Sequence, residues 1–210
     1  MYHKANAITV GAMADVGEGG FGLAFFSSRG PTRDDRVKPE IVAPGVNIMA
    51  ARANTSSGYV AYSGTSMATP FVSGSIALML DANPGLTVQQ VKDLLQQSSQ
   101  EWGPPGQDHD YGWGRLDTYR AVARAGNHSE SGAPPVPGHL SFTGHLNGGA
   151  SVDHLFTVND TSYPINATLL MEGSGTSPDL DLYLYNPAGQ EIGRAAGTSR
   201  QDQVVVAVNQ

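Results

Sequence analysis

One serine lies among residues whose types and spacing could support nucleophilic chemistry. Small residues surround Ser66 in the segment Gly64-Thr65-Ser66-Met67-Ala68-Thr69-Pro70, and an apolar run, 71–80, follows at once. Pro70 is typical of a first helical turn, where its missing N–H costs nothing. The segment therefore predicts a serine at the N-terminus of a buried helix, where unpaired amides and the helix dipole could stabilise an oxyanion.

A second interpretation of Ser66 involves no chemistry. Serine is a common N-cap residue, so Ser66 could simply cap a core helix. The catalytic interpretation needs more than the serine. A serine hydroxyl stays protonated at neutral pH, so it requires a base to take its proton and an acid to orient that base.

The elements that would position Ser66 are short strands separated by turns. Four apolar segments before the serine are expected to be strands, at residues 7–12, 38–45, 46–50 and 59–62. Glycine and proline between them mark the turns. After the apolar run, Thr87 and Gln90 predict a capping box, and Val88, Val91, Leu94 and Leu95 would form the core face of the helix that follows. Asp117 is expected to cap a last helix, 118–125.

These segments resemble the subtilisin-like serine proteases, the subtilases. The resemblance rests on the motif Gly64–Gly74 and on three upstream landmarks in the family's order, Val10-Gly11-Ala12, Phe26–Pro31 and Ile41–Gly45. Tyr111–Asp117 resembles the turn that closes the family's catalytic domain. The resemblance implies an α/β fold, with residues 1–126 as the C-terminal portion of a parallel-sheet domain. It also implies peptide-bond hydrolysis, with Ser66 as nucleophile and its own amide as an oxyanion donor. Phe71 departs from the family, where histidine is common, and this difference is interpreted as packing.

The resemblance also implies that the partners of Ser66 are not in this chain. The family order is Asp, His, Ser, and the oxyanion Asn precedes the strand matched by residues 7–12, so all three would lie upstream of Met1. His3 lies beside that strand, and Asp15 follows it in the reverse order. The remaining histidines are expected in solvated loops: His109, His128, His139, His145 and His154. The chain alone is therefore predicted to lack significant protease activity, and no substrate-binding residue is assigned.

Composition changes after residue 126. Residues 127–138 are rich in Asn, Ser, Gly and Pro, which predicts an exposed linker. Residues 139–210 carry period-two segments at 154–158, 167–171, 179–185 and 204–208, typical of a small all-β sandwich or jelly roll. The segment 179–189 resembles the pre-peptidase C-terminal domain of secreted proteases. That resemblance implies missing last strands and secretion.

Two carboxylates in this second region could bind a metal. Asp179 and Asp181 could supply hard oxygens to Ca²⁺, with Asn186 or backbone carbonyls completing the shell. The alternative is a solvated strand face. No cofactor is expected for catalysis.

Charge and composition exclude several classes of function. A net charge of −7 and a pI near 5.2 argue against nucleic acid as the main partner. The absence of cysteine excludes disulfides and a cysteine nucleophile. The N-terminus lacks the apolar stretch of a signal peptide, and the run 71–80 is too short to span a bilayer, so a soluble chain without membrane contact is expected.

Two functions are left open by the sequence. The first is the nucleophile half of a secreted subtilase, acting on polypeptides, with the missing N-terminal part of the same enzyme as a candidate partner. The second is a non-catalytic binding or stabilising module, in which the β-rich domain does the work and the protease remnant is inert.

Overall fold

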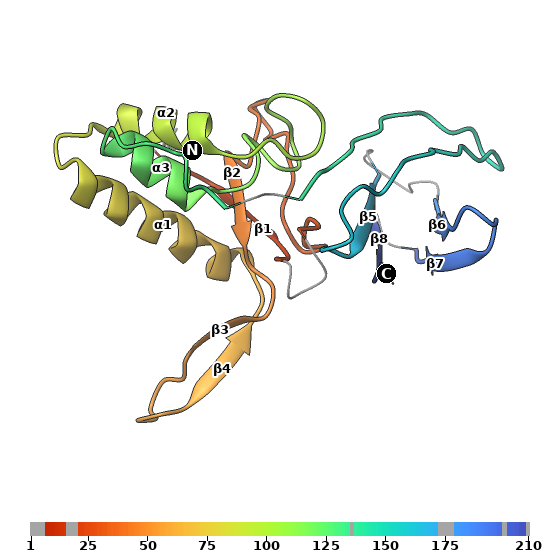
Figure 1. Cartoon of the computed structure of the whole chain (residues 1–210), viewed down its shortest axis with the longest axis horizontal. Coiled ribbons are helices and arrows are strands. Elements are labelled where there is room, and N and C mark those ends of the chain that lie inside the picture. Colours follow the sequence, from red (N-terminus) through yellow and green to blue (C-terminus); the bar gives the residue numbers. More distant parts are fainter. Residues whose placement is uncertain (1–6, 16–20, 135–136, 172–178, 199–200, 209–210) are drawn as a thin grey trace. The chain divides into compact units, whose positions relative to one another are not determined.

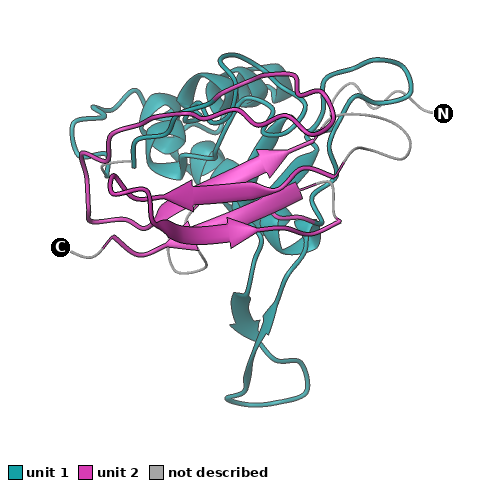
Figure 2. Cartoon of the chain, turned by 90° about the vertical axis from the view of Figure 1, so that its right-hand side faces the viewer, with its two compact units in different colours: residues 1–13, 26–141 teal, residues 14–25, 142–210 magenta. Residues whose placement is uncertain are grey.

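The computed structural model describes residues 7–15, 21–134, 137–171, 179–198 and 201–208 (Figure 1). The chain forms two compact units (Figure 2). Unit 1 comprises residues 1–13 and 26–141, and unit 2 comprises residues 14–25 and 142–210. The units are therefore not divided at the limits 126 and 139 expected from composition. Residues 127–141 cluster with unit 1, and residues 14–25 cluster with unit 2.

Unit 1 is built around a short parallel sheet. Strands β1 (Val10–Met13) and β2 (Ile41–Pro44) pair in parallel, with Val10 opposite Ile41. The segment 113–116 binds the other edge of β2, because Val42 donates to the carbonyl of Gly114 and accepts from the amide of Leu116. Strand β2 is thus central, and its first three residues are fully buried.

Three helices lie together on one side of unit 1, and α1 (Thr65–Ala82) is the one that packs against the sheet (Figure 1). Helix α1 packs against β1, β2 and helix α3 (Thr118–Ala125), and α3 packs in turn against helix α2 (Val88–Ser98). The hydroxyls of Ser75 in α1 and Thr118 in α3 lie 2.6 Å apart, which ties the two helices together.

Helix α1 is buried along one stripe only. Its buried residues share one face and are Ala68, Val72, Ser75 and Met79. On other faces Phe71 is 41% exposed and Leu78 is 52% exposed. The expectation of a buried helix is therefore wrong for this outer side, because in the described part of unit 1 only one side of α1 has a layer to pack against.

The predicted helix caps are confirmed. The Thr87 hydroxyl accepts from the Gln90 amide, and the Gln90 side chain accepts from the Thr87 amide, which completes the capping box of α2. Asp117 caps α3 by accepting from the amide of Arg120. On the core face of α2, Val91 and Leu95 are buried, Leu94 is half-buried and Val88 is exposed, so the prediction for Val88 is wrong.

A two-stranded hairpin projects from unit 1 below the helices (Figure 1). Its strands are β3 (Ile48–Ala51) and β4 (Tyr59–Tyr62), antiparallel, with Ile48 opposite Tyr62. The predicted strand at 46–50 thus begins two residues later. Apolar side chains of the hairpin are exposed, among them Met49 and Tyr59.

Unit 2 contains two antiparallel strand pairs. Strand β5 (Ile165–Leu170) pairs with β8 (Gln201–Val206), and β6 (Leu182–Tyr185) pairs with β7 (Glu191–Ala195). A Cβ at Gly193 would lie 2.5 Å from the Val204 side chain, so β7 approaches β8 closely. The alternation in β6 is confirmed, since Leu184 is buried between exposed tyrosines. The elements described in unit 2 are all strands. Their assembly into a jelly roll stays a prediction.

The predicted strand at 154–158 does not form. From residue 137 to residue 164 the structure describes neither helix nor strand, and Leu155 is 96% exposed. No strand in the described part of unit 2 pairs with this segment. Among the described residues, no helix is long and apolar enough to cross a membrane.

Candidate active site

Ser66 lies beside the carboxyl ends of the parallel strands. Gly45 follows β2; its amide donates to the Met13 carbonyl at 2.9 Å, and its carbonyl accepts from the Gly64 amide at 2.8 Å. These two bonds fasten the start of α1 to the last residues of β1 and β2. In open parallel sheets this edge is where ligand sites form.

Gly45 is required by the closeness of this packing. A Cβ there would lie 2.7 Å from the Cβ of Ala12 and 2.8 Å from the carbonyl oxygen of Gly64. The second of these atoms is backbone, so it cannot rotate away. Any larger residue would displace the turn that precedes Ser66.

Ser66 is not the cap of α1. The helix begins at Thr65, its N-cap is Gly64, and no side chain caps it, so the capping interpretation is wrong. Ser66 is the second helical residue and is exposed. The amides of Met67 and Ala68 donate to the Gly64 carbonyl at 3.0 and 3.3 Å. The Ser66 amide precedes them in the first turn, where helical amides lack an intrahelical acceptor.

Pro70 lies inside α1 and not in its first turn. The predicted position is wrong because the helix starts five residues earlier. Pro70 has no amide hydrogen, and in an α-helix that hydrogen would bond the carbonyl of residue 66. The proline is tolerated because the bond it removes lies at an exposed helix end. The Ser66 carbonyl is consequently without its usual helical partner.

No base or acid accompanies Ser66 in the described part of unit 1, where its hydroxyl is bonded to no histidine or carboxylate. His3 lies outside the described residues. His128 lies next to Gly126, whose Cβ position is 3.4 Å from Ala82, the last residue of α1. Ala82 lies about 24 Å along the helix from Ser66 at 1.5 Å per residue.

His109 lies at the opposite edge of the sheet. The amide of Trp113, from the same loop, bonds the carbonyl of Glu40, which immediately precedes β2. This loop therefore lies at the amino end of a strand whose four residues span about 13 Å. His139 stacks on Trp102 with ring centroids 4.7 Å apart. Neither histidine is placed as a base for Ser66.

The loop that carries His109 contains a buried polar pair that sequence patterns did not reveal. His109 Nδ1 and Asp108 Oδ2 are both buried without a hydrogen-bond partner in the described chain. Burial raises the pKa of Asp108, although its other oxygen accepts from the amides of Tyr111 and Asp110. The pair has no periodicity and no motif. Only the three-dimensional folding of the loop buries it.

The described residues do not assemble a metal centre. No group of three or more His, Asp or Glu side chains in the described chain could hold an ion. Asp179 and Asp181 are exposed, and Asp181 accepts from the hydroxyl of Tyr183 at 3.2 Å. Because Ca²⁺ takes six to eight oxygen ligands, these two residues alone do not fit it. Calcium binding stays a prediction. Thermal melting with and without calcium would test it, and an unshifted melting temperature would contradict it.

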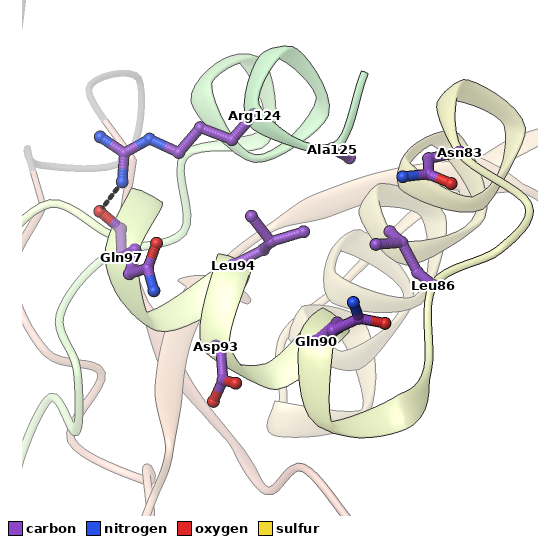
Figure 3. A pocket seen from close by; sticks show the side chains of 8 residues that line it. All are labelled: Asn83, Leu86, Gln90, Asp93, Leu94, Gln97, Arg124 and Ala125. Atoms are coloured by element: carbon purple, nitrogen blue, oxygen red, sulfur yellow. Dashed lines mark hydrogen bonds between the residues drawn. The ribbon is translucent and has the colours of Figure 1, made fainter. Parts of the chain in front are cut away.

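A shallow pocket of about 330 Å³ lies at the far end of α1 (Figure 3). It is lined by Asn83, Leu86, Gln90, Asp93, Leu94, Gln97, Arg124 and Ala125. Asn83 follows the last residue of α1, so the pocket is remote from Ser66 by the length of the helix. In Figure 3, Arg124 reaches across to the Gln97 carbonyl. The pocket is therefore not part of the serine site.

Comparison with known proteins identifies the region that holds Ser66. The sequence profile of the subtilase family matches residues 2–114, just over half of the chain. This chain belongs to the subtilase family. Within the subtilase match lie β1, β2, the hairpin, α1 and α2.

Several subtilases are similar over only part of their length. The serine protease AprX of Bacillus subtilis is 41% identical over 133 residues, which are 55% of this chain and 29% of AprX. The minor extracellular protease Vpr of the same organism is 32% identical over 182 residues, 80% of this chain and 22% of Vpr. The solved structure of the Clostridium perfringens CspB protease is 30% identical, covering 59% of this chain and 27% of that one, with a TM-score of 0.49. The chain thus spans less than a third of these relatives.

Proposed function

We propose that this chain supplies the nucleophile half of a secreted subtilase endopeptidase that acts on polypeptides. The observation that carries the proposal is the placement of Ser66. It is an exposed serine in the first turn of α1, fastened to the carboxyl ends of β1 and β2, within the region that matches the family. The similarity to an extracellular protease such as Vpr supports secretion.

In this function Ser66 acts as nucleophile once a base is brought to it. Its oxygen would attack the peptide carbonyl while the base takes the hydroxyl proton. The Ser66 amide, at the positive end of the helix dipole, would donate to the developing oxyanion. Nothing in the described part of unit 1 supplies the base, so the isolated chain is expected to be inactive.

The outer face of α1 supports the need for a further protein layer. Phe71 and Leu78 are exposed on this face, although large apolar side chains of a helix normally face a protein core. Between them, Gly74 has no atom within 4 Å of a Cβ position. A mid-helix glycine costs about 0.5–1 kcal/mol relative to alanine. Close packing of another element against Gly74 would explain why glycine, and not alanine, stands at this helix position.

The two-stranded sheet points to the same need. Parallel sheets are normally covered on both faces and contain more strands than β1 and β2. On its open edge β1 donates from the Ala12 amide to the hydroxyl of Ser27, at 3.0 Å, instead of to a strand. The candidate partner is the N-terminal part of a subtilase catalytic domain, which would bring the Asp, the His and the oxyanion Asn.

A non-catalytic module is the second candidate, favoured by the absence of a base near Ser66 in the described residues of unit 1. A fluorophosphonate probe separates the two functions, because it labels a serine only when the hydroxyl is activated. We expect no labelling of the present chain. We expect labelling of an N-terminally extended product of the same gene, abolished by Ser66→Ala.

Two outcomes of the labelling experiment would overturn the proposal. The first is an extended product that folds and remains unlabelled, which would favour the inert module. The second is casein cleavage by the present chain that survives Ser66→Ala, which would show that Ser66 is not the nucleophile. Circular dichroism of both products establishes that they are folded.

A further inference from the structure

The segment that follows α3 is held to the helices by one carboxylate. Glu130 accepts from Arg124 through both of its oxygens, from Nε at 2.5 Å and from Nη2 at 3.3 Å. The Nε of Arg120 lies 3.7 Å from the same carboxylate. A two-pronged bond of this kind fixes orientation as well as distance.

The arginine of this pair is itself anchored. Arg124 Nη1 donates to the carbonyl of Gln97 at the end of α2, as Figure 3 shows. Arg120 donates to Asp117, the cap of α3, at 2.5 Å. One connected network therefore joins α2, α3 and Glu130. We name the group Glu130, Arg124 and Arg120 the charge clasp.

Backbone contacts follow the same path along the chain. The amide of His128 donates to the Ala123 carbonyl at 2.7 Å, and the amide of Ala133 donates to the Glu130 carbonyl at 3.0 Å. A Cβ at Gly132 would lie 2.7 Å from the hydroxyl oxygen of Tyr119. Residues 127–134 are thus attached to the helices, and most of them are exposed, as their composition predicted.

Residues 127–134 and 137–161 alike have no helix or strand and are mostly exposed, including Leu140 and Leu155. They differ in that the described residues 137–161 form no ion pair, whereas Glu130 is bonded to Arg124. Endopeptidases cut segments that are exposed and locally unfolded. We propose that the charge clasp protects residues 127–134 and confines proteolytic cleavage between α3 and β5 to residues 137–161. This inference does not depend on the activity of Ser66.

A glutamyl endopeptidase tests the clasp at its central residue. Hydrolysis of the Glu130–Ser131 bond consumes one water, breaks the C–N bond, and leaves a carboxylate on Glu130 and an amine on Ser131. In the unchanged chain we expect this cut to be slow, because Glu130 is held by Arg124. In Arg124→Gln the released Glu130 should be cut at least about fivefold faster.

The matched control is Arg36→Gln, which makes the same charge change in unit 1 by removing the exposed Arg36–Asp34 pair. It should leave the Glu130 cut unchanged. Chymotrypsin should cut the unchanged chain within residues 137–161 first, with fragments identified by mass spectrometry. Equal rates of the Glu130 cut in the unchanged chain and in a folded Arg124→Gln, or a first cut within 127–134 by proteinase K, would overturn the proposal.

A second measurement covers the case in which Arg124→Gln fails to fold. Salt screens partly exposed ion pairs, so 1 M NaCl should accelerate the Glu130 cut in the unchanged chain. The rate is divided by that of a free peptide of residues 127–134 under the same conditions. An unchanged ratio would contradict the clasp.

Discussion

At the scale of single residues, Ser66 has the position of a nucleophile but lacks the groups that would activate it. The bonds of Gly45 to Met13 and Gly64 place the serine at the strand ends. Its hydroxyl nevertheless has no base in the described part of unit 1. Position follows from local backbone packing, whereas activation requires a second side chain. A nucleophile motif is therefore evidence of family and not, by itself, of activity.

Asp108 provides a prediction at this scale. Burial raises the pKa of its carboxyl, so the folded state favours the protonated form. Stability from this residue is then fully present at low pH and is lost as the pH rises from the ordinary carboxyl pKa through the raised one. Asp108→Asn keeps an acceptor for the amides of Asp110 and Tyr111 and removes the charge. We expect the variant to be about 1 kcal/mol more stable at pH 7, measured by urea unfolding.

The pH series is the control for Asp108→Asn. The gain should shrink toward pH 3, where Asp108 is protonated in both states of the unchanged chain. A gain of the same size at pH 3 and pH 7 would show that charge is not the cause.

At the scale of elements, two glycines of unit 1 make opposite predictions. Gly45→Ala places a methyl group against the backbone of Gly64, so we expect a loss of about 1–3 kcal/mol in stability. Gly74→Ala meets open space in a helix interior, so we expect a gain of about 0.5–1 kcal/mol in the present chain. Thermal unfolding of both variants measures the contrast, and a destabilised Gly74→Ala would contradict it.

How much of these elements could be predicted depends on whether the signal is local. Capping of α2 by Thr87 depends on residues three apart, and the sequence predicted it correctly. The start of α1 was misplaced because Pro70 suggested a first turn, while the bond from Gly64 to Gly45, far away in sequence, fixes the true start. The strand at 154–158 has strand-forming residues but no partner. Whether Val88 and the outer face of α1 are buried likewise depends on which other elements pack against them, and a local sequence pattern does not show that.

At the scale of the whole molecule, the chain consists of two units whose chain segments interleave. Residues 14–25 belong to unit 2 although both neighbouring segments belong to unit 1. A family match that covers residues 2–114 therefore includes part of both units. Cleavage between residues 137 and 161 would leave residues 14–25 on the fragment that carries Ser66, without the rest of unit 2.

The charge clasp predicts that the proteolytic susceptibility of residues 127–134 depends on pH. The bond from Arg124 lowers the pKa of Glu130, and the charge of Arg120 acts in the same direction, whereas Asp117 opposes them. Because this pKa is depressed on folding, the clasp is intact above the ordinary glutamate pKa and is lost as the pH falls through the lowered value. We expect residues 127–134 to become susceptible to pepsin only below the ordinary glutamate pKa, as the pH falls through the lowered value.

Glu130→Gln is the control for the acid effect. Its susceptibility in 127–134 at neutral pH, measured with proteinase K, should already exceed that of the unchanged chain. In Glu130→Gln, the pH dependence of pepsin digestion should be no greater than that of the free peptide of residues 127–134. A clear difference from the peptide would assign the acid effect to another group.

Pro70 has a consequence for the motion of the nucleophile. Since Pro70 has no N–H to donate to the Ser66 carbonyl, opening the first turn of α1 breaks one bond fewer than in an uninterrupted helix. Hydrogen exchange should therefore be faster for the amides of Met67 to Thr69 than for those of Val72 to Met79, and Pro70→Ala should slow it. Equal protection along the whole helix would contradict this. Such a turn would let Ser66 adjust its direction toward a base that arrives from elsewhere, while the remainder of α1 stays fixed to the sheet.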